Sequence, residues 1–318
     1  MLAAGSDCPG RPVVRISRPR LAAALASVIL LLAFAPPAAA AVPYRVSPFA
    51  LAELTRSQLP YTGQSVRSLP PARGPADEQG IPVVLIGTKA YYHPVAIALG
   101  GLRLIDSYQQ TGTVGYIDWA RKYAAKLRQI AIASGGGLYL PYWFDYPSEG
   151  LRAPWYSAMA QGLGLSLFVR LYRETRSPAH LETAHRLFDT FRRIGPQSRP
   201  WIQRVDSNGY LWLEEYPRAD RLDRVLNGFL YATFGLYDYW QLTHWPMPAT
   251  VLRGAMTTMR AHVWRYRVPG GVSLYCLYHR TRHVKYHLVH IWQLAALGRM
   301  SGDSYFTTMS ARFAADYP

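Results

Sequence analysis

A stretch of 64 residues between Asp238 and Asp303 contains no aspartate or glutamate. Its densest part, residues 275–290, alternates fixed positive charge with tyrosines and histidines, which can transfer protons. Ordinary solvated faces mix both signs of charge, whereas a surface of one sign attracts ligands of the opposite sign. The stretch therefore predicts chemistry on an acidic substrate. Its basic residues are Arg253, Arg260, Arg265, Arg267, Arg280, Arg282, Lys285 and Arg299.

Helical periodicity recurs from about residue 95 to the end of the chain. Several breaks carry helix-start signals, because Pro178 can open a helix and Asp303 can cap one. The periodic segments form four consecutive pairs, which predicts four helical hairpins. They span residues 95–108 and 116–133, 155–175 and 179–194, 223–242 and 249–266, and 285–299 and 303–316.

The connections between these pairs have strand character. Residues 135–146 are aromatic and begin with glycines, and residues 201–217 resemble a β-hairpin that turns at Asn208 and Gly209. Residues 270–278 are a third short extended candidate. The alternation predicts a mainly α fold, an (α/α) toroid or barrel of about four hairpins with short β-hairpin connections. In such a fold the loops are expected to carry the site.

The N-terminal 40 residues have the pattern of an export signal: four arginines, an apolar run over residues 21–35, and then small residues. The run is shorter than the roughly 20 residues of a spanning helix, so we expect cleavage and export to the periplasm or the cell exterior. Retention as a membrane anchor is the alternative. Residues 41–79 contain several prolines and are expected to form an extended lead-in, with the folded domain over residues 80–318.

The chain of 318 residues is strongly basic, with a formal net charge of +16. Removal of residues 1–40 takes away four arginines and one aspartate and leaves +13. Together with export, this charge favours an acidic polysaccharide as partner over nucleic acid. Cys276 is the only cysteine besides Cys8, so the exported chain has no intrachain disulfide. A homodimer is left open.

Several motifs resemble the C-terminal domain of the D-glucuronyl C5-epimerases, which act on heparosan-type chains. In order, they are WYSAMAQG (155–162), LEEYP (213–217), LNGF (226–229) with GLYD (235–238), and YH (286–287) with His290 and Gln293. A weaker match lies in GIP (80–82) and YHPVAIA (92–98). The resemblance implies a helical barrel that inverts carbon 5 of a hexuronate within a polymer, as in the conversion of D-glucuronate to L-iduronate.

The resemblance also implies catalytic residues. Glu215 and Tyr216 match a family glutamate and tyrosine, Tyr286 matches a later tyrosine, and Tyr275 matches a third, with Tyr278 as the competitor. We expect Tyr216 and Tyr286 to flank the sugar as an acid/base pair, with Glu215 as a second base or as a group that orients Tyr216. One tyrosine would enter as phenolate if neighbouring cations lowered its pKa from about 10. Of Glu214 and Glu215, at least one is expected to be a solvated charge.

The remaining candidates are expected to contact the substrate. They are His287, His290, Arg280, Arg282, Asn227, Tyr278 and Gln161, the last with a purely structural role as the alternative. His279, His283, His287 and His290 are spaced as if on one helix face, but the basic residues among them would repel a cation. We therefore predict no metal and no cofactor.

Two features of the sequence differ from the family pattern. Tyr278 stands where the family has an arginine, and only about sixty residues separate His93 from Trp155, where family members carry a β domain.

A polysaccharide lyase would need similar groups, because it removes the same C5 proton before it expels the C4 substituent. A non-catalytic protein that binds acidic glycans is the alternative from another class. A glycoside hydrolase is less favoured, since it needs two carboxylates across a cleft.

Overall fold

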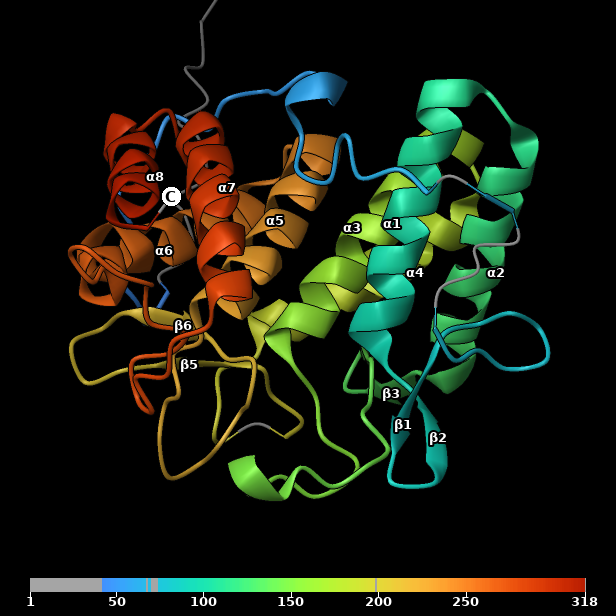
Figure 1. Cartoon of the computed structure of the whole chain (residues 1–318), viewed down its shortest axis with the longest axis horizontal. Coiled ribbons are helices and arrows are strands. Elements are labelled where there is room, and N and C mark those ends of the chain that lie inside the picture. Colours follow the sequence, from blue (N-terminus) through green and yellow to red (C-terminus); the bar gives the residue numbers. More distant parts are fainter. Residues whose placement is uncertain (1–41, 67, 70–73, 198, 318) are drawn as a thin grey trace, which may run out of the picture. The chain divides into compact units, whose positions relative to one another are not determined.

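The computed structural model describes residues 42–66, 68–69, 74–197 and 199–317; the predicted signal over residues 1–40 lies outside them. The described part contains eight α-helices, in agreement with the predicted four pairs (Figure 1). The helices are α1 (Pro94–Thr111), α2 (Val114–Ile130), α3 (Ala158–Thr175), α4 (Pro178–Asp189), α5 (Leu226–Thr243), α6 (Pro246–His262), α7 (Val284–Ser301) and α8 (Ser304–Asp316). Short 3₁₀ segments are η1 (Arg56–Gln58), η2 (Pro147–Glu149), η3 (Thr190–Arg192) and η4 (Val263–Tyr266).

Helix boundaries follow the capping residues of the sequence. Pro178 is the first residue of α4, and the Asp303 side chain accepts a hydrogen bond from Tyr305 N, as predicted for the start of α8. Ser157 caps α3 in the same way, so α3 begins three residues later than predicted. The second predicted helix ends early, at Ile130, because residues 132–134 pair as a strand instead.

Three antiparallel hairpins precede inner helices: β1 (Val83–Ile86) with β2 (Lys89–Tyr92), β3 (Ile132–Ser134) with β4 (Gly137–Tyr139), and β5 (Gln203–Val205) with β6 (Leu211–Leu213). The β5–β6 hairpin is the predicted one, and its turn contains Asn208 and Gly209. The β1–β2 hairpin was not predicted. Before α7, a single bridge between Leu274 and Arg282 takes the place of a hairpin.

The inner helices α1, α3, α5 and α7 pack in sequence order, and α2, α4, α6 and α8 lie beside their hairpin partners (Figure 1). Helix α5 is buried almost all round, as its continuous apolar sequence requires. It crosses α3 closely, because a Cβ on Gly235 would overlap the backbone of Gly162. This contact gives two of the family motifs, residues 155–162 and 235–238, a packing role.

The described part of the predicted lead-in packs against the helices. Phe49, Leu54 and Tyr61 are buried in the core. Tyr237 on α5 fixes the segment, since its hydroxyl donates to Ala52 O (2.7 Å) and accepts from Leu54 N (3.0 Å). None of the described helices is long and apolar enough to cross a membrane.

Candidate functional site

A cavity of about 520 Å³ lies at the N-terminal ends of the four inner helices. His93 caps α1, and Met159, Asn227 and Lys285 each occupy the second position of α3, α5 and α7. Helix N-termini carry about half a positive charge each, so their convergence favours a negatively charged ligand. The loops that follow β4 and β6 complete the wall. The other lining residues are Val84, Ile86, Val95, Leu99, Arg103, Tyr142, Phe144, Tyr146, Trp155, Glu215, Tyr216, Tyr231, Tyr286 and Val289.

The structure brings together the four residues predicted to be catalytic. The Tyr275 hydroxyl donates to Glu215 Oε1 (3.2 Å) and lies 3.1 Å from the Tyr216 hydroxyl. The rings of Tyr275 and Tyr286 have centroids 4.7 Å apart. Glu215, Tyr216 and Tyr286 line the cavity, and Tyr275 contacts all three without lining it. The four side chains come from two loops and α7, so no single motif holds the whole set.

The hydrogen bonds between these groups have a direction. A phenol has one proton, and that of Tyr275 is donated to Glu215. Tyr216 must therefore donate to Tyr275 in the 3.1 Å contact between their hydroxyls. The result is a chain from Tyr216 through Tyr275 to Glu215, along which a proton can move towards the carboxylate.

The electrostatics favour Glu215 as the proton acceptor. Burial raises its pKa to about 7, against the effect of the tyrosine hydrogen bonds, and the nearby Glu149 contributes to the rise. Burial and the charge of Glu215 raise the pKa values of Tyr216, Tyr275 and Tyr286. The predicted lowering of a tyrosine pKa is wrong for the protein alone, because Arg280 and Arg282 are exposed and do not line the cavity.

Neither of the paired glutamates is a solvated charge, so that prediction is also wrong. Glu214 is fully buried, and its Oε2 accepts hydrogen bonds from the backbone N–H groups of Asp223 (2.9 Å) and Arg224 (3.3 Å). Burial raises its pKa to about 8. Glu215 is partly buried, and its Oε2 is shielded from solvent and has no hydrogen-bond partner among the described residues. Glu214 thus shapes the loop before α5, and Glu215 faces the site.

Of the predicted substrate contacts, only Asn227 lines the cavity. Its Oδ1 atom is buried and has no hydrogen-bond partner among the described residues, so it can accept one from a ligand. Tyr278 is 54% exposed and lies under Arg221, and Arg280 and Arg282 are exposed as well. These three side chains lie outside the cavity.

The predicted contacts His287, His290 and Gln161 are buried in structural roles. His287 accepts from Ser273 N (3.0 Å) and stacks on Phe313 of α8, and His290 pairs with the Ser273 hydroxyl (2.8 Å). Gln161 accepts from Leu140 N (2.7 Å) and donates to Leu138 O (2.9 Å), which joins α3 to the β3–β4 hairpin. These contacts agree with the purely structural role that was the alternative for Gln161.

Sequence reasoning missed Arg103 and gave His93 no role, yet both line the cavity. Val95, Leu99 and Arg103 are four residues apart and share one face of α1, so a basic residue in this apolar row was the available signal. His93 Nδ1 accepts from Ala96 N (3.4 Å), which leaves the proton of the neutral ring on Nε2. Burial lowers its pKa to about 4, so it is a neutral hydrogen-bond donor at pH 7.

The four histidines spaced as if on one helix face form no cluster of ligand atoms in the described part of the chain. His279 and His283 are exposed, and the other two are buried. In the described part of the chain, ligand atoms of Glu149, Asp223 and His279 do lie within 4.8 Å of one another. The guanidinium of Arg221 already bridges these carboxylates, at 2.6 Å from Asp223 and 3.1 Å from Glu149. This cluster is an ion-pair network beside the cavity.

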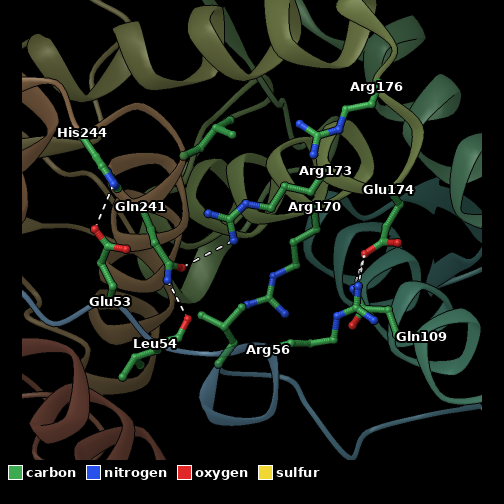
Figure 2. A pocket seen from close by; sticks show the side chains of 12 residues that line it. Glu53, Leu54, Arg56, Gln109, Arg170, Arg173, Glu174, Arg176, Gln241 and His244 are labelled. Carbon is green, nitrogen blue, oxygen red and sulfur yellow. Dashed lines mark hydrogen bonds and ion pairs between the residues drawn. The ribbon is translucent and has the colours of Figure 1, made fainter.

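A second cavity, of about 480 Å³, lies at the other ends of α3 and α5 and is rich in arginine (Figure 2). Arg170 binds the buried Asp238 through two hydrogen bonds (2.9 and 3.1 Å), and Arg56 pairs with Glu174 (3.1 Å). Helix C-termini carry partial negative charge, so basic side chains are favourable there. The partial charge of the helix ends is therefore negative here and positive in the first cavity, whose walls include helix N-termini.

Known proteins resemble this chain in sequence and in structure. The family described as D-glucuronyl C5-epimerase C-terminus matches residues 136–315. The D-glucuronyl C5-epimerase of Caenorhabditis elegans is 39% identical over 88 residues, which is 28% of this chain and only 14% of that protein. Cellobiose 2-epimerase from Bacillus thermoamylovorans superposes with a TM-score of 0.52 at 11% identity, over 71% of this chain and 59% of that chain. A sugar epimerase from a ruminal bacterium gives 0.50 at 14%, with the same coverage.

The structural neighbours are too distant in sequence to show more than the fold, and they identify a mainly helical protein of the α/α-toroid type. The predicted fold class is therefore confirmed. The family match covers more than half of the chain. The chain belongs to the D-glucuronyl C5-epimerase family, through the C-terminal domain of that family.

Proposed function

We propose that the protein is a C5-epimerase of hexuronate residues in an acidic polysaccharide, of the type that converts D-glucuronate to L-iduronate in heparosan-like chains. The observation that carries the proposal is the hydrogen-bonded chain from Tyr216 through Tyr275 to Glu215, on the wall of the cavity that also contains Tyr286. Family membership supports the reaction type.

The chain of hydroxyls can remove the C5 proton. The phenolic oxygen of Tyr216 accepts this proton while its own proton passes to Tyr275, and the proton of Tyr275 passes to Glu215. The electron pair of the C–H bond moves into the substrate carboxylate and forms an enolate. Glu215 is suited to the terminal role, because its pKa of about 7 places it close to the working pH of a general base.

Inversion requires that a proton then reach C5 from the opposite face of the ring. Tyr286 is the candidate donor, because it lines the same cavity and its raised pKa keeps it a phenol. The enolate collapses as C5 takes the Tyr286 proton, and the tyrosine regains a proton from water. Since the Tyr286 hydroxyl takes its proton from solvent, the product carries a solvent hydrogen at C5, and Glu215 releases the abstracted proton to solvent between turnovers.

The enolate needs positive charge and hydrogen-bond donors near its two oxygens. Lys285 lies beside Tyr286 at the start of α7 and pairs with no carboxylate among the described residues. His93 adds a neutral Nε2–H, and the helix N-termini add partial positive charge. Asn227 Oδ1 can accept a hydrogen bond from a sugar hydroxyl.

Incubation with heparosan and other polyuronates in deuterated water, followed by NMR, tests the proposal. The wild-type protein should incorporate deuterium at C5 without cleaving the chain, and Tyr286→Phe should abolish formation of the deuterated C5 epimer. Tyr116→Phe, on α2 and away from the cavity, is the matched control and should retain it. Unsaturated products that absorb in the ultraviolet would identify a lyase instead, and binding without any exchange would identify a non-catalytic glycan-binding protein.

The place of action is part of the proposal. The signal-like residues 1–40 and the net charge of +16 support export and an acidic partner. Fractionation of expressing cells, with N-terminal sequencing of the exported protein, tests both export and cleavage.

A further inference from the structure

A side cavity of about 430 Å³ adjoins the main cavity and shares Arg103, Tyr231 and Val289 with it. Its outer wall consists of Trp292 on α7 and residues 64–66 of the N-terminal segment. The two cavities therefore meet at Arg103 and Tyr231. A ligand too large for the main cavity can extend into the side cavity along this boundary.

The side cavity offers a fixed aromatic surface. The Trp292 ring contacts those of Tyr61, Tyr231 and Phe234, with centroids between 5.8 and 6.4 Å apart. Such packing restrains the ring, so that the part of it that lines the side cavity can contact the apolar face of a sugar at little cost in side-chain entropy. The segment opposite is restrained too, because Val66 N donates to Ser107 Oγ of α1 (2.8 Å).

Arg103 supplies the charge at this boundary. Its side chain is exposed, and the described residues give it neither an ion pair nor a side-chain hydrogen bond. A guanidinium binds carboxylate and sulfate groups through two parallel hydrogen bonds. The nearby Tyr231 hydroxyl stays a phenol, since burial raises its pKa to about 12, and can donate a further hydrogen bond.

We infer that Arg103, Tyr231 and Trp292 form a subsite for the sugar that adjoins the reacting uronate, and that Arg103 binds an acidic group, sulfate or carboxylate, on that side of the chain. The inference rests on the proposed function. It makes the protein selective for the interior of an acidic polymer over short fragments. The predicted arginines of residues 280–282 have no part in this selection.

The test compares C5 deuterium exchange on an octasaccharide of heparosan and on its disaccharide, which has one uronate and no further acidic group for Arg103. Arg103→Gln should lower kcat/KM for the octasaccharide about tenfold through KM, and change the value for the disaccharide less than twofold. Arg103→Lys should restore part of the loss. Arg299→Gln is the control, because Arg299 is exposed and lines neither cavity, and this variant should match the wild type. Equal losses on both substrates, or no loss on either of them or on an N-sulfated octasaccharide, would overturn the inference.

Two further arms complete the test. An N-sulfated octasaccharide identifies the acidic group: a loss confined to it assigns sulfate to Arg103, and equal losses on both octasaccharides assign carboxylate. If the wild type shows no exchange at all, the proposed function fails, and calorimetry then decides the subsite alone. In that case tenfold weaker octasaccharide binding by Arg103→Gln supports the subsite, and unchanged binding refutes it.

Discussion

Replacement of Glu215 by glutamine should make the protein more stable and less active at the same time. A carboxyl group whose pKa is 4.5 in the unfolded chain and about 7 in the native protein binds more protons in the native state. Its contribution to stability is complete below pH 4.5 and is lost as the pH rises towards 7. The full shift corresponds to ~3 kcal/mol, an upper limit because Glu215 is only partly buried.

The pH dependence separates this effect from any constant effect of the substitution. Between pH 5 and pH 8, the stability of Glu215→Gln relative to the wild type should increase by about 2 kcal/mol. Urea unfolding at the two pH values measures this difference. Glu214 remains in both proteins, so its own raised pKa cancels. C5 exchange by the variant should fall at least 100-fold, the usual value of a lost general base.

Two outcomes would refute the reasoning. If the relative stability did not change with pH, Glu215 would not be held in a site that disfavours its charge. If exchange survived in a stably folded variant, Glu215 would not be the terminal base. Glu182→Gln, on the exposed face of α4, controls for the loss of one negative charge and should alter neither quantity.

Two further substitutions test the packing around the site. A Cβ on Gly228 would overlap the Glu215 carboxylate, so Gly228→Ala should reduce exchange at least tenfold in a folded protein, whereas Gly271→Ala, which meets only Val268 at 3.5 Å, should leave exchange unchanged. Exchange assays and circular dichroism on both variants decide the point. Asp238→Asn would leave the buried Arg170 without its partner and should destabilise the protein by about 3–5 kcal/mol in urea, whereas the exposed Asp118→Asn should cost less than about 1 kcal/mol. Equal effects of the two asparagine variants would contradict the buried ion pair.

The helices were predictable because their signals are local. Apolar periodicity and the caps at Pro178 and Asp303 act within one or two turns, and each element carries them in its own sequence. The β1–β2 hairpin was missed because residues 83–92 are only partly buried and their alternation is weak. Residues 155–157 were assigned to α3, but Trp155 bridges to Tyr142 across a connection that periodicity does not reveal.

The site was predictable only where family motifs carried it. Glu215, Tyr216, Tyr275 and Tyr286 converge as the resemblance implied, although they come from distant parts of the chain. The substrate contacts failed for a different reason. Positive charge in the sequence does not say which way a side chain points, and the loop before α7 leaves Arg280 and Arg282 exposed while the helix itself buries His287 and His290.

Residues 239–302, the stretch without aspartate or glutamate, contribute to the main cavity through the start of α7 more than through their arginines. Of its eight basic residues, only Lys285 lines the main cavity. The N-termini of α1, α3, α5 and α7 supply positive potential there without any charged side chain. Since residues 239–302 contain no carboxylate, they add no negative charge that would offset this potential. Glu215 is therefore the acidic side chain that the cavity must accommodate. Burial raises its pKa to about 7, and hydrogen bonding with the neighbouring tyrosines keeps the pKa from rising further.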